Sequence, residues 1–195
     1  MRLLQSTSLD AGENLATEER LLDEGRPCAF LWRSRSAVVV GRHQIVEDEV
    51  RPDPAIPVFR RMTGGGAMYM DEGDLNICFI GDKTLREAAE VLAVGLRDLG
   101  VPAEFSGRND ITVEGRKVSG WAGIERNGVT LTHGTLMFDV NLDRLELVLT
   151  PPSNKLARHG IASVRSRVAN VREFLPWMDF GTFCKGVANY LSQQL

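Results

Sequence analysis

The stretch RRMTGGGAMYMD at residues 60–71 is the most informative part of this 195-residue chain. Its first residues predict a strand that ends in three consecutive glycines, residues 64–66. A backbone without side chains can approach a ligand closely and direct its N–H groups at anionic oxygen. A second stretch, GRKVSG at residues 115–120, places Lys117 on a tight turn between two strand-like runs. Because a lysine is a mobile point charge, the two stretches predict a site where a carboxylic acid meets a nucleotide phosphate.

The glycine run differs from the common phosphate-binding loops. No Gly-Lys-Ser/Thr step follows it, which excludes a P-loop. Tyr69 stands where a dinucleotide-binding fingerprint has its third small residue. The segment that follows is strand-like, so no helix dipole is expected beneath the loop. Taken alone, the glycines are equally consistent with a glycine-rich hairpin turn.

Composition and charge limit the class of protein. The net charge of -3 gives no basic field that would attract nucleic acid, so nucleic acid is not an expected partner. The cysteines Cys28, Cys78 and Cys184 are far apart and odd in number, which argues against a disulfide framework or a CxxC metal site. No apolar run is long enough to span a membrane, and no signal-peptide pattern is present. We therefore expect a single domain over residues 1–195 in the cytoplasm, with no membrane partner.

The pattern of apolar residues predicts helices flanking a block of strands. Thr84 and Glu87 form a capping box at the start of the clearest helix, Gly100 ends it, and Asn127-Gly128 is a strong hairpin signal. Gly25 is expected to end the first helix, and the pair Pro151-Pro152 to end the third. Helices are predicted at residues 14–24, 84–99, 142–149 and 179–191, and strands at 30–33, 37–41, 58–62, 75–80, 110–114, 117–125 and 129–140. The predicted class is α+β with mixed or antiparallel sheets.

Many separated segments together resemble the lipoate–protein ligase family, within the wider group that includes biotin ligases and octanoyltransferases. The stretch at 60–71 resembles that family's RRxTGGGAVYHD signature, with Met70 in place of the usual His. The other matching segments are NLA with EE at 14–19, VVGRHQ at 39–44, GDLN at 73–76, RNDI at 108–111, GRKVSG at 115–120, HGTL at 133–136 and SVRSRVAN at 163–170. The resemblance covers nearly the whole chain and implies a biotin/lipoate-ligase-like catalytic domain.

The resemblance also implies a reaction in two steps. Lipoate, the substrate, would react with ATP and Mg²⁺ to give lipoyl-AMP and pyrophosphate. The lipoyl group would then pass to one lysine of a lipoyl-acceptor domain, either an E2 subunit or the glycine-cleavage H protein.

Lys117 is the candidate catalytic residue, bridging the carboxylate oxygen and the α-phosphate. At an effective dielectric constant of about 20, a unit charge at ~4 Å contributes about 4 kcal/mol, which would offset the repulsion between the two anions. Without the resemblance, an exposed lysine on a turn would be the simpler interpretation.

The remaining candidate residues are also implied by the resemblance. Strand alternation puts Arg60 and Arg61 on opposite faces, and Arg61 is the one expected at the ligand. Asp110 is the candidate Mg²⁺ ligand, since a hard cation prefers carboxylate oxygen. The lipoyl-adenylate is expected to contact Val39, Gly41, Arg61, Thr63, Gly64, Gly65, Gly66, Ala67, Asn76, His133 and Gly134, and the nucleotide Asn109, Asp110 and Gly120.

Several residues keep two interpretations. His133 is either a hydrogen-bonded structural histidine or packs beside the adenylate or Lys117. Arg165 and Arg167 either reach phosphates or form a solvated basic face. The separation of His43 and His159 gives no metal-ligand spacing.

The apolar part of lipoate could gain on the order of 5 kcal/mol from burial, at about 0.8 kcal/mol per CH₂. Its candidate walls, each also suited to an ordinary core, are Val39, Val40, Met68 and Trp121.

One departure from the family leaves three options open. Full-length ligases of this kind carry a C-terminal accessory domain, which we expect to be absent here. A separate protein could supply it, the single domain could act alone, or the chain could only transfer acyl groups. Transferases of this fold use a cysteine thiolate, but residues 104–108 and 150–154, where it is expected, contain none. This favours the adenylate mechanism, although folding could still bring Cys28 to the site. A non-catalytic lipoate- or nucleotide-binding subunit and a biotin ligase are two further candidate functions.

Overall fold

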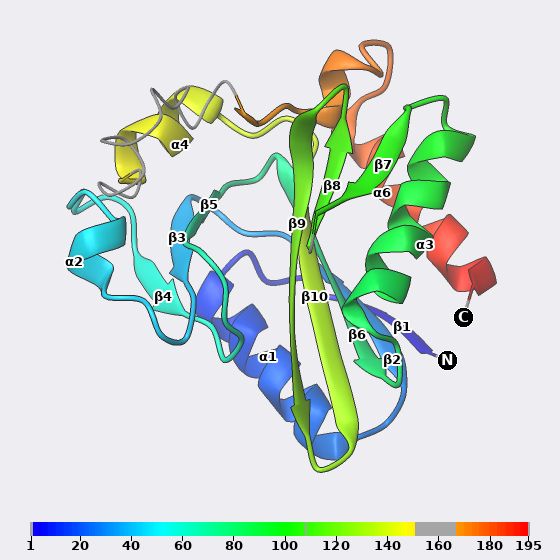
Figure 1. Ribbon diagram of the computed structural model, residues 1–195, viewed down its shortest axis with the longest axis horizontal. Coiled ribbons are helices and arrows are strands. Elements are labelled where there is room, and N and C mark those ends of the chain that lie inside the picture. Colours follow the sequence, from blue (N-terminus) through cyan, green and yellow to red (C-terminus); the bar gives the residue numbers. More distant parts are fainter. Residues whose placement is uncertain (1, 108, 151–166, 195) are drawn as a thin grey trace.

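A computed structural model describes residues 2–107, 109–150 and 167–194 and contains two mixed β-sheets flanked by helices (Figure 1). The large sheet has seven strands in the order β1-β2-β6-β10-β9-β8-β7. Only β1 and β2 pair in parallel, and every other pair in this sheet is antiparallel. The strands are β1 (Arg2–Gln5), β2 (Cys28–Trp32), β6 (Asp74–Gly81), β7 (Ala103–Ser106), β8 (Asp110–Val113), β9 (Arg116–Arg126) and β10 (Val129–Met137). The predicted α+β class with mixed sheets is confirmed.

The small sheet has three strands in the order β4-β3-β5. β3 (Ala37–Val40) pairs in parallel with β4 (Val58–Arg60) and antiparallel with β5 (Met68–Met70). The chain from β4 to β5 carries the three glycines, so the glycine loop connects the two outer strands of this sheet across its central strand. Figure 1 shows the small sheet beside the large one, with α2 (Val46–Glu49) and α4 (Leu142–Val148) on its outer side.

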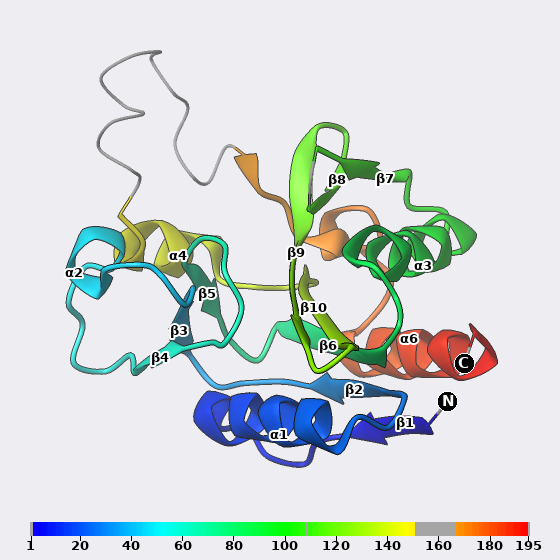
Figure 2. The same cartoon turned by 60° about the horizontal axis from the view of Figure 1, so that its bottom comes forward.

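The two faces of the large sheet have different partners. α3 (Leu85–Asp98) and α6 (Phe180–Gln194) cover one face and share a core with Ile77, Phe79 and Leu136. α1 (Ala11–Glu24) lies against the opposite face, where Cys78 and Ile80 from the same strand β6 point. Figure 2 shows α1 on the side of the sheet away from α3. Because side chains alternate along each strand, every central strand contributes one set of residues to the α3–α6 core and the other set to the face that meets the small sheet.

The helix ends follow the local signals in the sequence. The Thr84 hydroxyl accepts from the Glu87 N–H and the Glu87 carboxylate accepts from the Thr84 N–H, which confirms the capping box. Gly25 and Gly100 adopt left-handed φ values of 66° and 87°, as expected for residues that end helices. Asn127 and Gly128 also both have positive φ, which fits the predicted hairpin turn.

The differences from the sequence prediction concern boundaries and short elements. α1 begins three residues earlier than predicted, because the Asp10 carboxylate caps it by accepting from the Glu13 N–H. The strands β1 and β7 and the short helices α2 and η2 (Val171–Glu173) were not predicted. They have three or four residues each, which is too few for a periodic pattern of apolar residues to be recognised in the sequence. Pro151 and Pro152 lie outside the described residues.

In the part of the chain that the structure describes, no helix is both long and apolar enough to cross a membrane. The cytoplasmic location stays a prediction.

Asp74, the first residue of β6, is an acid buried in the sheet. Its side chain is 0% exposed, and neither carboxylate oxygen has a hydrogen-bond partner of regular geometry among the described residues. Burial raises the pKa of Asp74 to about 8, and the nearby Asp71 carboxylate adds to the increase. The backbone N–H groups of Leu75 and Leu136 oppose this change only in part. Asp74 therefore folds as the neutral acid at neutral pH.

This buried acid predicts a pH-dependent stability. Because the folded state keeps the Asp74 proton that the unfolded chain releases, the free energy of unfolding should fall as pH rises from about 4 to about 8, by up to about 1.4 kcal/mol per pH unit. Asp74→Asn removes the ionisable group at nearly constant size and should flatten this slope and stabilise the protein at pH 7. Urea unfolding across this range measures the effect, with the exposed Asp98→Asn as control. An unchanged slope in Asp74→Asn would show that the acid is paired.

Candidate functional site

A cavity of about 500 Å³ is bordered by both sheets, α1 and α4. It brings together segments that are far apart in the sequence, the glycine loop, the β8–β9 hairpin and the middle of β10. The predicted site residues that line it are Val39, Arg61, Gly65, Gly66, Ala67, Asn76, Asn109, Asp110, Lys117, Gly120, His133 and Gly134. Most of the site predicted from the sequence is therefore gathered at one cavity.

Lys117 is the second residue of β9, just after the turn rather than on it. The turn residues Glu114 and Gly115 both have positive φ, which makes the β8–β9 hairpin tight. The segment after the undescribed residues pairs with Lys117, because Val168 bridges to it in parallel and the Ala169 N–H donates to its carbonyl at 2.9 Å. The backbone of Lys117 is thus held on both sides, while its side chain is 37% exposed at the cavity.

The Lys117 amine forms an ion pair with Asp110. Nζ lies 2.8 Å from Asp110 Oδ1, although the geometry is not that of a regular hydrogen bond. Gly120 makes this arrangement possible, since a Cβ at that position would lie 2.6 Å from Nζ. Glycine is needed at position 120 so that the lysine side chain can lie across β9 toward the cavity.

Asp110 is the only predicted metal ligand, and the described residues contain no group of three or more His, Cys, Asp or Glu side chains that could hold a metal ion. The buried Oδ1 of Asp110 pairs with the Lys117 amine but accepts no regular hydrogen bond in the described part of the chain. Mg²⁺ commonly binds one or two carboxylates and takes its other ligands from phosphates and water. The chemistry of Asp110 therefore fits Mg²⁺ that arrives with a nucleotide. The neighbouring Asn109 uses its side-chain amide to donate to the Trp121 carbonyl at 2.9 Å.

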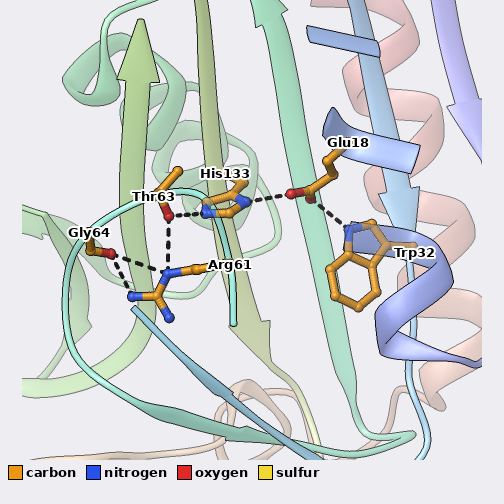
Figure 3. Close-up of polar contacts among 6 residues, drawn as sticks. All are labelled: Glu18, Trp32, Arg61, Thr63, Gly64 and His133. Carbon is orange, nitrogen blue, oxygen red and sulfur yellow. Dashed lines mark hydrogen bonds and ion pairs between the residues drawn. The ribbon is translucent and has the colours of Figure 1, made fainter. Parts of the chain in front are cut away.

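The buried Arg61 side chain holds the glycine loop through hydrogen bonds to its carbonyl groups. Its side chain is 6% exposed, and Nη2 donates to the Gly64 carbonyl at 2.7 Å (Figure 3). Nη2 also donates to the Gly66 carbonyl at 2.8 Å. Nη1 donates to the Val39 carbonyl at 3.3 Å. Gly65, between the two bound carbonyls, has φ of 90°, a backbone conformation that favours glycine. Burial lowers the pKa of Arg61 to about 10, while the Glu18 carboxylate acts to raise it. Arg61 lines the cavity as predicted, but its described partners belong to the loop and to β3.

A row of hydrogen bonds continues from Arg61 to α1 (Figure 3). Arg61 Nε donates to Thr63 Oγ1 at 3.0 Å, and Thr63 Oγ1 lies 2.8 Å from His133 Nε2. His133 Nδ1 lies 2.6 Å from Glu18 Oε2, and Trp32 Nε1 donates to Glu18 Oε1 at 2.8 Å. His133 is therefore both hydrogen-bonded within the protein and part of the cavity wall.

Three residues that were predicted to contact the lipoyl-adenylate do not line the cavity. Thr63 and Gly64 do not border the cavity, and Thr63 is 1% exposed. Gly41 packs directly beneath the loop, because a Cβ there would lie 2.2 Å from the Gly65 carbonyl oxygen. The contacts of these three residues indicate that they shape the loop.

Of the four predicted apolar walls, Val39 and Met68 line the cavity, while Val40 packs in the core beside α4. Trp121 borders the cavity, but its ring stacks with Phe79 in the core under α3 and α6. The ring also covers Gly134, where a Cβ would lie 2.4 Å from it. Position 134 therefore requires glycine for packing inside the sheet.

The remaining charged candidates divide into two groups. Arg60 points away from the cavity and donates from Nη1 to the carbonyls of Gly41 and Gln44, which confirms that the two arginines lie on opposite faces. Arg167 borders the cavity. Arg165 and His159 lie outside the described residues.

The cysteines do not supply a nucleophile at this cavity. Cys28 and Cys78 are 0% exposed and Cys184 lies on α6; none of the three lines the cavity. Burial is the main cause that raises the pKa of each thiol, most strongly for Cys78, where Glu18 adds its charge. A raised pKa disfavours the thiolate that acyl transfer through cysteine requires.

Glu18 is the main residue that the sequence prediction missed. It lies at the cavity with its side chain almost fully buried. The signal was present, since Glu18 falls three residues after Leu15 and three before Leu21, on the apolar stripe of α1. An acid on such a stripe needs hydrogen-bond partners inside the protein.

Fold and site together define an α+β domain in which a lysine-bearing hairpin and a glycine loop share one largely apolar cavity. The sequence profile described as lipoyl protein ligase A/B catalytic domain matches residues 10–192. The chain therefore belongs to this family.

Two curated relatives support the assignment. Lipoate-protein ligase LplJ of Bacillus subtilis (strain 168) is 40% identical over 83% of this chain and 53% of its own length. Lipoate-protein ligase A of Blochmanniella pennsylvanica (strain BPEN) is 36% identical over 99% of this chain and 61% of its own length. The chain thus spans a little over half the length of these two relatives.

Solved structures of ligases have the same fold. Lipoate-protein ligase A bound with ATP superposes with a TM-score of 0.84 at 29% identity, covering 98% of this chain and 84% of that one. A bipartite archaeal lipoate protein ligase from Thermoplasma acidophilum was studied with its E2 lipoyl domain. It superposes with a TM-score of 0.79 at 30% identity, covering 98% of this chain and 83% of that one. A T. acidophilum protein with bound lipoic acid superposes with a TM-score of 0.83 at 27% identity, covering 98% of this chain and 84% of that one.

The contact between Gly120 and Lys117 predicts a variant that separates folding from function. In Gly120→Ala, the new methyl group should displace the flexible end of Lys117 and break its pairing with Asp110. We expect ligand affinity to fall about tenfold or more, because a charge that is no longer aimed at the ligand loses most of its effect. Stability should change little, since alanine is tolerated in a strand and a lysine end moves easily. Thermal unfolding and lipoate titration measure both effects. Full affinity in Gly120→Ala would mean that the observed lysine position is not the one used.

Proposed function

We propose that this chain is the catalytic domain of a lipoate–protein ligase, which activates lipoate with MgATP to lipoyl-AMP and transfers the lipoyl group to a lysine of an acceptor domain. One observation carries the proposal: the Lys117 amine and the triple-glycine loop border the same cavity. A carboxylate and an α-phosphate can meet there beside a cation and under a backbone without side chains.

The residues have separate tasks in this reaction. Lys117 neutralises the two anions as they approach, which lowers the barrier because the charge is already in place. Residues 65–66 cover the acyl-adenylate and exclude water, while the hydrogen bonds of Arg61 hold the loop in shape. Asp110 and the nucleotide phosphates would hold Mg²⁺, which would supply further positive charge at the phosphates. Holding the reactants together could contribute roughly 7–11 kcal/mol more.

The apolar part of the cavity suits the acyl chain of lipoate. Its wall includes Leu15, Val39, Met68 and Met70, contributed by α1 and the small sheet. Met70 occupies the position where the family signature has His, and it is 1% exposed within a core cluster. The methionine therefore keeps this part of the wall apolar.

We propose a lipoyl-acceptor domain as the protein partner, either an E2 subunit or an H protein. The support is the bipartite T. acidophilum ligase, which was studied together with its E2 lipoyl domain. The same neighbour supports a second polypeptide that assists adenylation. Assays should therefore include reactions with and without such a component.

The choice of acyl donor tests the proposal against acyl transfer and against mere binding. An acceptor domain is incubated with free lipoate plus MgATP, with lipoyl-AMP, or with octanoyl-carrier protein, and its mass is measured. Labelling by the free acid or by the adenylate is the expected result. Labelling by the carrier-bound acyl group alone would identify a transferase, and binding without labelling would identify a non-catalytic subunit.

Replacing Lys117 tests the chemistry directly. In Lys117→Met the side chain keeps similar length but loses its charge, so lipoate-dependent pyrophosphate exchange should fall by about a hundredfold or more. The unfolding midpoint should stay close to that of the unaltered protein, because an ion pair this exposed contributes little to stability. The exposed Lys185→Met on α6 is the matched control. Normal exchange in Lys117→Met would remove this lysine from the mechanism.

A further inference from the structure

Glu18 is a carboxylate buried at the centre of the α1 face. Its side chain is 1% exposed and receives Trp32 Nε1 at Oε1 and His133 Nδ1 at Oε2. The Cys78 thiol is a further hydrogen-bonding neighbour of the carboxylate. Figure 3 shows Glu18 between the Trp32 indole and the His133 ring. An acid in this position is tolerated because donors surround it on both oxygens.

The carboxylate fixes the direction of every hydrogen bond in the row. A carboxylate only accepts, so His133 carries its proton on Nδ1 and leaves Nε2 as an acceptor. Thr63 Oγ1 lies 2.8 Å from that nitrogen and donates its hydroxyl proton to it. The Thr63 oxygen is then free to accept from Arg61 Nε at 3.0 Å. With a neutral His133, this order satisfies all three bonds.

The row ends on the backbone of the glycine loop. Arg61 Nε and Nη2 donate to the Gly64 carbonyl at 3.2 and 2.7 Å, and Nη2 donates to the Gly66 carbonyl at 2.8 Å. A guanidinium is planar, so fixing Nε on Thr63 also fixes the plane in which the Nη atoms meet the loop. The shape of residues 64–66 therefore depends on a carboxylate at the far end of the row.

We propose that Glu18 is a positioning residue for the acyl-adenylate site. It sets the tautomer of His133 and, through Thr63 and Arg61, holds the triple-glycine loop in the form that receives the ligand. The proposal rests on the proposed function for the identity of the ligand, and it assigns to Glu18 and Thr63 a task that does not require contact with it. The competing interpretation is that Glu18 only satisfies the buried Trp32 indole and stabilises α1.

Glu18→Gln distinguishes the two interpretations, because an amide has one oxygen acceptor for two N–H donors. When its oxygen accepts from Trp32, its NH₂ group meets His133 Nδ1, which must then lose its proton. Nε2 becomes a donor, and Thr63 Oγ1 faces donors from both His133 and Arg61. The reversed tautomer therefore leaves the hydroxyl proton of the buried Thr63 without its acceptor, so the hydroxyl must reorient and disturbs the geometry that Arg61 Nε and the loop depend on.

The first measurement is the ¹⁵N spectrum of His133 together with the amide signals of Gly64, Gly65 and Gly66. We expect a protonated Nδ1 and an unprotonated Nε2 in the neutral side chain of the unaltered protein. In Glu18→Gln this signature should be lost and the three glycine signals should shift. The matched control is Glu19→Gln, an exposed neighbour on the same helix that pairs with Arg126 on the surface. These spectra require no ligand, so they can be interpreted whatever the protein's activity.

The second measurement is steady-state kinetics of acceptor lipoylation, separated into kcat and KM for lipoate. Glu18→Gln should raise KM for lipoate and lower kcat/KM by about tenfold or more, the scale of losing a buried charge-assisted hydrogen bond. Thr63→Val removes the hydroxyl at equal size and should have a similar effect. Thr63→Ser keeps the hydroxyl and should lose much less. The unfolding midpoints of all variants show whether each remains folded.

The proposal is overturned by a protonated Nε2 on neutral His133 in the unaltered protein. It is also overturned when folded Glu18→Gln shows the kinetics and glycine signals of Glu19→Gln, or when Thr63→Ser is as impaired as Thr63→Val. Failure of the proposed function has a different signature, since the unaltered protein would then not lipoylate the acceptor while the His133 and glycine spectra still report on the row.

Discussion

The guanidinium of Arg61 is the interaction on which the site depends. A charge buried this deeply is tolerated only when its donors are satisfied, and Arg61 meets this requirement with the carbonyls of Val39, Gly64 and Gly66 and the Thr63 hydroxyl. A lysine could not replace it, because one ammonium cannot reach partners spread over a planar fork. Gly65 follows from the same constraint, since a Cβ at position 65 would lie 2.9 Å from Arg61 Nη2.

The alternation of strands divides the large sheet into a structural face and a functional face. Trp121 and Gly134 show the division, since the indole covers the glycine on the side of α3 and α6. The residues that directly precede them in sequence, Gly120 and His133, fall on the other face and reach the cavity. One strand pair thus supplies a rigid core and a ligand site at once, which places the lysine hairpin on a stiff support. A shift of one residue in the pairing would exchange the two faces.

The sequence predicted the parts whose signals are local. The capping box at Thr84, the turn at Asn127 and the strand alternation of Arg60 and Arg61 depend on residues close in sequence, and the structure confirms them. The roles of Glu18 and Gly134 depend on partners that only tertiary pairing reveals, since Glu18 meets His133 across 115 positions. The family resemblance identified which segments belong to the site. It could not distinguish residues that line the cavity from those, such as Thr63, that support its wall.

The charges of the site differ in burial, and this difference suits their tasks. Arg61 and Glu18 are almost fully buried and are held by several partners each, so they keep a fixed geometry. Lys117 and Asp110 are each more than a third exposed, and an ion pair of that kind contributes only about 0–1 kcal/mol. The lysine can therefore leave Asp110 for an anionic ligand at little cost. The loop stays rigid while the cation remains available, which is the combination that joining two anions requires.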